Sequence, residues 1–142
     1  MTIAFVYPGQ GSQYVGMGRD LYESYDEIKE LYISSNKILG YEISKVSFEG
    51  PEEELKQTKI TQPAIVIHSI AATMLLKNHK AGLAAGHSLG EFSALISAGA
   101  LSFEDGLKLV QKRGELMQDP GEKNKGTMAA IIGLDSVLLR EV

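Results

Sequence analysis

A serine flanked by two glycines is the first feature of this sequence that could do chemistry. Residues 86–90 read Gly-His-Ser-Leu-Gly, with a short apolar run at 81–85 before them and apolar residues at helical spacing over 89–96 after them. A serine hydroxyl is a weak nucleophile, and enzymes that use one place it on a sharp turn from strand to helix. The pattern predicts that Ser88 is a nucleophile; the alternative is a serine that only caps the helix.

A glycine-rich loop near the N-terminus is the second candidate. Residues 8–13 read Pro-Gly-Gln-Gly-Ser-Gln, directly after a β-branched and aromatic run at 3–7. Such a loop can bring backbone N–H groups close to an anionic or polarised oxygen. A phosphate loop would need Gly-Lys-Ser/Thr, but the first lysine is Lys29, and the dinucleotide fingerprint would need glycine where Tyr14 stands. The loop is therefore interpreted either as an oxygen-binding turn or as a plain flexible turn.

The three histidines do not supply an obvious base for Ser88. His68 falls within an apolar helical pattern, where a partly buried, hydrogen-bonded imidazole is expected, and His79 follows at the basic end of that helix. His87 is the neighbour of Ser88, and a tight turn directs adjacent side chains apart. Because the histidines lack metal-ligand spacing and the sequence has no cysteine, we expect no metal, no disulfide and no cofactor.

Length and composition predict one domain, or part of one, in 142 residues. The 44% apolar and 23% charged residues are typical of globular proteins, and no apolar run is long enough to span a membrane. The N-terminus shows no secretory signal, which favours a cytoplasmic location. A net charge of -4 without clustered Lys and Arg argues against nucleic acid as a partner.

The pattern of elements predicts an α/β fold with a mainly parallel sheet and flanking helices. We expect a buried first strand at 3–7, a second strand at 81–85 and a third at 127–132. Helices are expected at 26–39, from Pro51 as first helical position, from Thr61, from Leu89 to Gly99, and from Phe103 to Met117 after a capping box at Ser102. Residues 119–126 are interpreted as a polar linker.

Five motifs, taken in order, closely resemble the malonyl-CoA:acyl carrier protein transacylase family. The resemblance covers the chain almost end to end, and the Phe48 to Leu55 segment is more similar to the stand-alone fatty acid synthesis enzyme than to a polyketide synthase domain. The motifs are Pro8 to Gln13, Thr61 to Ala64, Gly86 to Glu91, Lys112 to Gly114 and Met128 to Gly133.

This resemblance implies a function and a set of roles. Ser88 would take malonyl from malonyl-CoA and pass it to the phosphopantetheine thiol of acyl carrier protein. The backbone N–H groups of Gln10 and Leu89 would form the oxyanion hole, as expected of the residue after an elbow serine and of a glycine-rich loop. Arg113 would bind the free malonyl carboxylate, which a guanidinium fits with two hydrogen bonds; taken without the resemblance, Arg113 is an ordinary surface arginine.

The resemblance also implies a domain division and leaves alternatives open. Residues 1–126 would be the N-terminal part of a truncated, hydrolase-like acyltransferase core, and 127–142 the opening strand and helix start of an inserted ferredoxin-like subdomain. By the same resemblance, the family's catalytic histidine and a further glutamine lie downstream of the strand at 127–132 and are absent from this chain. We therefore expect the chain alone to be inactive and to need the missing part, for example from a complementary chain. A serine hydrolase or thioesterase and a non-catalytic fragment are the alternatives.

Overall fold

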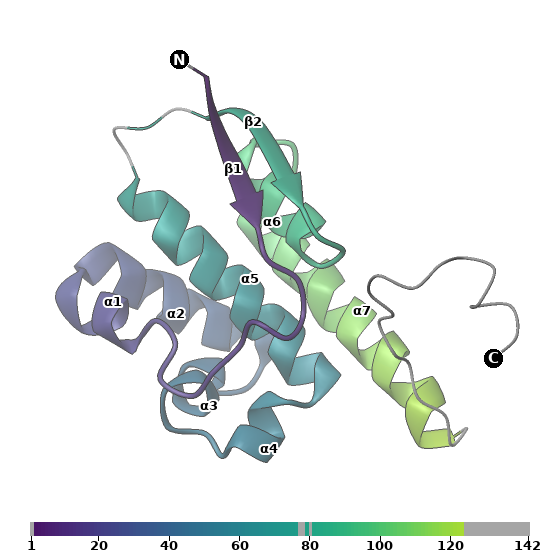
Figure 1. Ribbon diagram of the computed structural model, residues 1–142. Helices are drawn as coiled ribbons and strands as arrows, with labels where there is room; N and C mark the ends of the chain where they lie inside the picture. Colours follow the sequence, from purple (N-terminus) through teal and green to yellow (C-terminus); the bar gives the residue numbers. More distant parts are fainter. Residues whose placement is uncertain (1, 77–78, 80, 124–142) are drawn as a thin grey trace, which may run out of the picture.

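The computed structural model describes residues 2–76, 79 and 81–123, the last five of these by their backbone alone. Two parallel strands and a group of helices make up this part of the chain, which confirms the α/β class (Figure 1). The third strand expected at 127–132 and the expected subdomain lie outside the described residues. The elements are β1 (Ile3–Tyr7), α1 (Arg19–Ser24), α2 (Asp26–Leu39), α3 (Ile43–Glu49), α4 (Glu52–Leu55), α5 (Thr58–Leu75), β2 (Ala81–Gly86), α6 (Gly90–Ser97) and α7 (Phe103–Lys123).

The sheet consists of β1 and β2 side by side, with Tyr7 at the end of one opposite Gly86 at the end of the other. Both strands therefore end at the same edge, and the glycine-rich loop and the serine turn leave the sheet next to each other (Figure 1). The prediction that the first strand is buried is wrong for the described residues. Val6 is 76% exposed and only Tyr7 is buried, because β1 has one strand partner and its outer face has no cover from the described residues.

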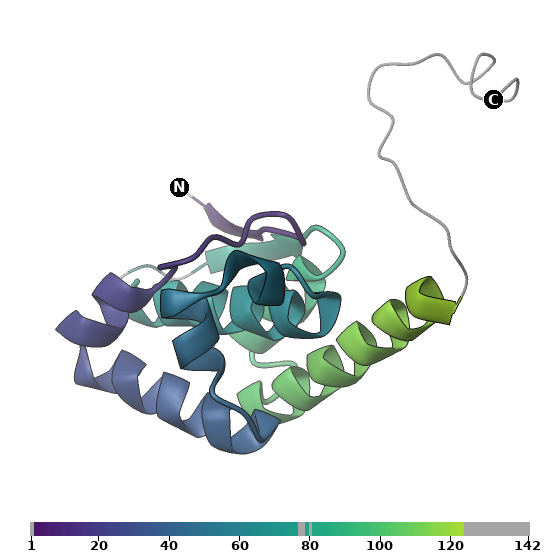
Figure 2. The same ribbon diagram turned by 90° about the horizontal axis from the view of Figure 1, so that it is seen from below.

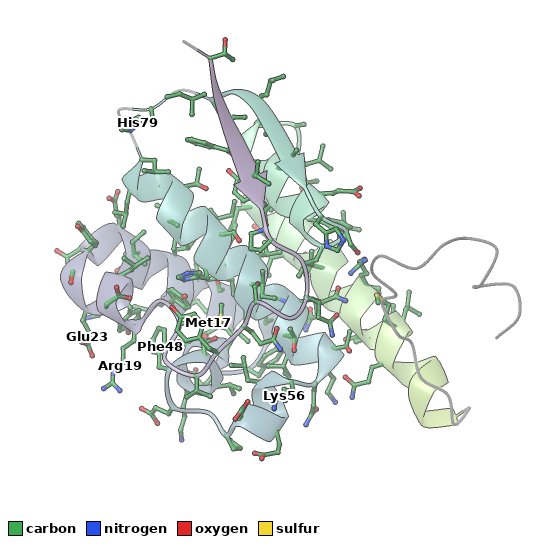
Figure 3. All side chains as sticks on the ribbon, in the orientation of Figure 1. Met17, Arg19, Glu23, Phe48, Lys56 and His79 are labelled. Atoms are coloured by element: carbon green, nitrogen blue, oxygen red, sulfur yellow. The ribbon has the colours of Figure 1, made fainter. Side chains whose placement is uncertain are left out.

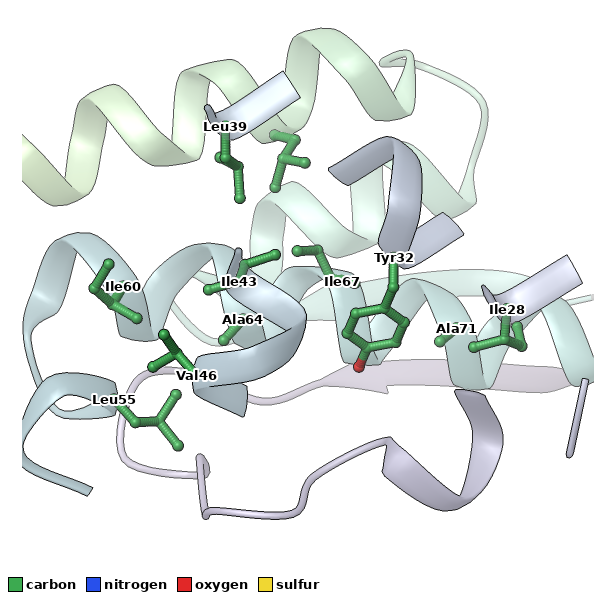
Figure 4. Close-up of a cluster of buried hydrophobic side chains, with 11 residues drawn as sticks. Ile28, Tyr32, Leu39, Ile43, Val46, Leu55, Ile60, Ala64, Ile67 and Ala71 are labelled. Carbon is green, nitrogen blue, oxygen red and sulfur yellow. The ribbon is translucent and has the colours of Figure 1, made fainter. Parts of the chain in front are cut away.

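Helix α5 is the centre of the core. Every residue from 60 to 67 is buried, since α5 packs against α7 most extensively and also against α2, α3 and α6. One apolar cluster lies between α5 and helices α2 and α3 (Figure 4). The Tyr32 ring of this cluster also meets the rings of Tyr22 and Phe48. A second cluster, which includes Met17 and Leu89, joins α5 to the start of α6. The elements that carry the site are thus fixed to the most buried helix.

Helix α5 starts earlier than the predicted Thr61, so that Pro63 lies inside the helix. The helix begins at Thr58, and proline has no N–H to offer the carbonyl oxygen of Lys59, four residues earlier. That oxygen instead accepts from the hydroxyl of Tyr41 at 3.4 Å. The lost helical hydrogen bond is replaced from α2's C-terminal side, so the helix tolerates the proline.

Other helix boundaries were predicted with mixed success. The bounds of α2 and its end at Gly40, with φ of 79°, are as predicted, and the Ser102 hydroxyl accepts from the Asp105 N–H at 3.1 Å, as the capping box requires. Pro51 precedes α4 instead of opening it. Helix α7 continues to Lys123 and so includes most of the linker expected at 119–126 (Figure 2).

Helices α1 and α3 were not predicted, since both are short and neither has a side-chain cap. Within the described part of the chain, no helix combines the length and the apolar character that crossing a membrane requires.

Candidate active site

Ser88 lies on a sharp turn between β2 and α6, with a backbone φ of 53°. It is the one residue other than glycine with a positive φ among the described residues, and serine adopts this left-handed conformation only where the surroundings impose it. Two glycines flank Ser88 at positions where the neighbouring backbone leaves no room for a side chain. A Cβ on Gly86 would lie 1.9 Å from the carbonyl carbon of Gly90, and one on Gly90 would lie 2.3 Å from the Tyr7 carbonyl oxygen. The crossing of strand and helix therefore requires both glycines.

The glycine-rich loop lies directly beside this turn. A Cβ on Gly9 would be 2.8 Å from the His87 carbonyl oxygen and 2.6 Å from its Nδ1, so the loop passes the turn as closely as two backbones allow. The His87 N–H donates to the Tyr7 carbonyl at 3.1 Å, which continues the strand pairing into the turn. Among the described residues, the N–H groups of Gln10 and Leu89 have no acceptor. Two adjacent segments thus each offer one unused donor.

Arg113 reaches Ser88 from α7. Its Nη2 donates to the Ser88 Oγ at 2.9 Å and its Nη1 donates to the Gln62 Oε1 at 2.7 Å, while the guanidinium lies 5.9 Å from the centre of the Phe92 ring. The side chain of Ser88 is exposed and Arg113 is partly exposed, so a ligand from solvent can approach both. The structure therefore brings together a hydroxyl and a cation that are 25 positions apart in the sequence.

Gln62 is a residue of this site for which the sequence suggested no role. It is fully buried on α5, accepts from Arg113, and donates from Nε2 to the Gln10 Oε1 at 3.3 Å and to the Met117 sulfur at 3.3 Å. Gln10 in turn donates to the Thr58 hydroxyl at 3.2 Å. A buried amide next to a proline in an otherwise apolar helix was the available signal, because a buried amide needs polar partners.

None of the three histidines forms a hydrogen bond to Ser88 among the described residues. The His87 ring packs against Gly9. His68 is partly buried on α5, but its Nδ1 is buried without a partner among the described residues, contrary to the expected hydrogen bond. Burial lowers the pKa of His68 against a smaller opposing effect of Asp20. His79 is exposed beyond the end of α5, at the opposite end of the strands from the serine turn (Figure 3).

The described residues contain no group of three or more His, Cys, Asp or Glu side chains that could hold a metal ion. At this turn the described residues bring together a hydroxyl, two backbone N–H groups and a guanidinium.

Comparison with known proteins assigns the chain to a family. The profile of the acyl transferase domain matches residues 4–138, which is nearly the whole chain. The chain belongs to the acyl transferase domain family. Its sequence is 46% identical to the malonyl CoA-acyl carrier protein transacylase of Bacillus subtilis over 99% of this chain, and 47% identical to that of Escherichia coli O157:H7 over 93% of it.

Solved structures of such acyl transferases have the same fold. A malonyl CoA-acyl carrier protein transacylase from Clostridium perfringens superposes with a TM-score of 0.83 at 36% identity, over 99% of this chain and 45% of that one. A malonyl-transacylase in complex with the acyl-carrier protein of a type II polyketide synthase superposes with a TM-score of 0.80 at 40% identity, over 84% and 40%.

The chain spans less than half the length of the curated relatives it matches, 45% for the Bacillus subtilis protein and 44% for the Escherichia coli protein. It is similar to the N-terminal part of these relatives.

Proposed function

We propose that this chain carries the acylation site of a malonyl-CoA:acyl carrier protein transacylase, acting in fatty acid or polyketide synthesis. The observation that carries the proposal is the 2.9 Å hydrogen bond from Arg113 to Ser88. A guanidinium this close to the nucleophile suits an acyl group whose carboxylate is one methylene away from the reacting carbonyl, which is the malonyl group. Longer dicarboxylic acyl groups would place their carboxylate beyond this position.

The first half-reaction forms an ester on Ser88. The Oγ attacks the thioester carbonyl of malonyl-CoA, the hydroxyl proton goes to a base, and the C–S bond breaks to release coenzyme A as the thiol. The N–H groups of Gln10 and Leu89 are proposed to donate to the oxygen that becomes negative during attack, since both lack acceptors and lie on segments that meet at Gly9. Arg113 would leave Ser88 to bind the malonyl carboxylate with two hydrogen bonds.

In the second half-reaction the phosphopantetheine thiol of acyl carrier protein attacks the ester, the C–O bond to Ser88 breaks, and the proton of that thiol passes through the base to the Ser88 Oγ. The names of similar proteins support this acceptor, and the structure of one of these proteins was solved in complex with an acyl-carrier protein. Both steps need a general base. Because no described histidine contacts Ser88, we propose that a part of the enzyme other than the described residues supplies it, either in the same chain or in a complementary one.

A transfer assay separates this proposal from the hydrolase alternative. The chain, alone and with a complementary acyl transferase segment, is loaded with radiolabelled malonyl-CoA, freed of unbound substrate, and given either buffer or holo-acyl carrier protein. With the complementary segment, we expect the label to move to the carrier protein and to stay on the enzyme in buffer, whereas the chain alone should transfer little label. Rapid release of malonate in buffer, with no gain from carrier protein, would identify a thioesterase instead.

A further inference from the structure

Gly114, the residue after Arg113, touches the backbone at the start of α5. A Cβ at this position would lie 2.8 Å from the Lys59 Cα and 3.0 Å from the Thr58 carbonyl oxygen. Both neighbours are backbone atoms, which cannot turn aside as a flexible side chain does. Helix α7 can therefore lie this close to α5 only while position 114 is glycine.

The first turn of α5 is held on both sides of this contact. The Lys59 N–H, one of the donors that a helix leaves unpaired at its start, donates to the Gln118 Oε1 on α7 at 3.2 Å. The Lys59 carbonyl oxygen accepts from Tyr41. Because the backbone opposite Gly114 is fixed, an added Cβ would have to move α7, and with it Arg113.

We propose that Gly114 and Gln62 are positioning residues for Arg113. Gly114 sets the distance between α7 and α5, and Gln62 fixes the direction of the guanidinium by accepting from Nη1, which leaves Nη2 facing Ser88. This inference rests on the proposed role of Arg113 in binding the substrate carboxylate. It adds that the preference for a carboxylate-bearing acyl group depends on how closely two helices pack.

A substitution with a matched control tests the distance. Gly106→Ala, on the same helix, makes the same change in helix propensity, but its Cβ would meet the ends of the Ile96 and Leu101 side chains. Serine acylation is measured by mass spectrometry after mixing the chain and the complementary acyl transferase segment with equal concentrations of malonyl-CoA and acetyl-CoA. We expect Gly114→Ala to lower the malonyl-to-acetyl adduct ratio by about fivefold or more, since small misplacements of a positioning group are costly. Gly106→Ala should leave the ratio unchanged.

Two further variants distinguish positioning from a merely structural effect. In the Arg113→Ala background, Gly114→Ala should not change the ratio further, because the residue it positions is gone. If Gly114→Ala prevents folding, Gln62→Leu decides, since it removes the acceptor for Arg113 and leaves the contact of Gly114 with Lys59 in place, and it must itself lower the ratio. An unchanged ratio in Gly114→Ala, or in Gln62→Leu where Gly114→Ala does not fold, would overturn the proposal.

An NMR measurement on 15N-arginine-labelled chain makes the outcome independent of activity. Because Gln62 accepts from Nη1 and Ser88 accepts from Nη2, the guanidinium should not rotate freely, and the two Nη groups should give separate signals. These signals are assigned by their loss in Arg113→Lys. Gly114→Ala should merge them through free rotation, and Gly106→Ala should not. Separate signals that persist in Gly114→Ala would refute the positioning role, whereas a wild-type chain that neither thioester acylates even with the complementary acyl transferase segment would refute the proposed function.

Discussion

At the scale of single residues, the left-handed conformation of Ser88 and the guanidinium of Arg113 define the site. The G-x-S-x-G spacing predicts the turn because glycine is required on both sides of the crossing, and this requirement is visible in sequence. Gln62 could not be assigned a role, because its partners Arg113 and Gln10 lie 51 and 52 positions away. Contacts across such distances follow from how helices pack, which the local sequence does not encode.

Arg113→Ala should lower the rate of Ser88 acylation by malonyl-CoA by at least about tenfold, because a hydrogen bond to a charged group contributes about 1.5 to 3 kcal/mol. Acylation by acetyl-CoA should change less, since acetyl has no carboxylate to bind. Arg19→Ala is the control, as Arg19 is paired with Glu23 on the exposed face of α1 (Figure 3). Equal losses with both thioesters would mean that Arg113 has a structural role only.

His68 should make the folded chain less stable in mild acid. Burial lowers its pKa in the folded state, so between that pKa and the ordinary value of about 6.5 the unfolded chain binds the proton more readily. The free energy of unfolding should therefore fall as the pH falls through this window. Urea unfolding of wild type, His68→Gln and the exposed-site control His79→Gln measures it. The free energy of unfolding should depend less steeply on pH in His68→Gln than in the other two proteins. An unaltered pH dependence in His68→Gln would show that His68 is not the group responsible.

At the scale of elements, local patterns fixed β1 and α2 well but left α1 and α3 undetected. A β-branched and aromatic run closed by Pro8 was sufficient for β1, and helical spacing that ends at Gly40 was sufficient for α2. The short helices have few residues over which a period can show, and they are stabilised by packing, as the Phe48 ring against Tyr22 and Tyr32 illustrates. In the first turn of α5 the Tyr41 hydroxyl donates to the Lys59 carbonyl oxygen that Pro63 leaves without a helical donor, a contact that no pattern around Pro63 reveals.

Gly86→Ala should destabilise the fold far more than Gly82→Ala, although both lie in β2. The Cβ at position 86 would overlap the Gly90 backbone, whereas the close contact of the one at 82 would be with the side chain of Thr2, and the nearest backbone atom would be 3.9 Å away. Overpacking against backbone costs about 1 to 3 kcal/mol or more. Urea midpoints report the difference, and similar midpoints for the two variants would show that the turn has more room than the structure indicates.

At the scale of the whole molecule, the sheet is the incomplete part of the described fold. Parallel sheets are normally covered on both faces, yet Leu83 is 66% exposed and Val6 76% exposed. The chain also spans less than half of its relatives' length. We infer that further acyl transferase sequence covers these strands in the active enzyme. Composition alone could not predict that the strands would be exposed in this part of the enzyme.

The isolated chain should therefore associate with itself through the strands. Sedimentation velocity over a range of concentrations should show growing oligomers, because exposed apolar patches favour association. Leu83→Lys should reduce the association more than Leu109→Lys, which changes an exposed leucine on α7 (51% exposed). A monomer at all concentrations, or equal effects of the two substitutions, would show that the sheet is not the associating surface.

The central claim is that Ser88 accepts the malonyl group, and peptide mapping after incubation with malonyl-CoA tests it most directly. Wild-type chain, Ser88→Ala and the control Ser12→Ala, which changes an exposed serine of the adjacent loop, are each incubated together with the complementary acyl transferase segment, digested and analysed by mass spectrometry. We predict a malonyl ester on the peptide that contains Ser88, present in wild type and Ser12→Ala and absent in Ser88→Ala. A malonyl adduct on another residue, or one that persists in Ser88→Ala, would contradict the account.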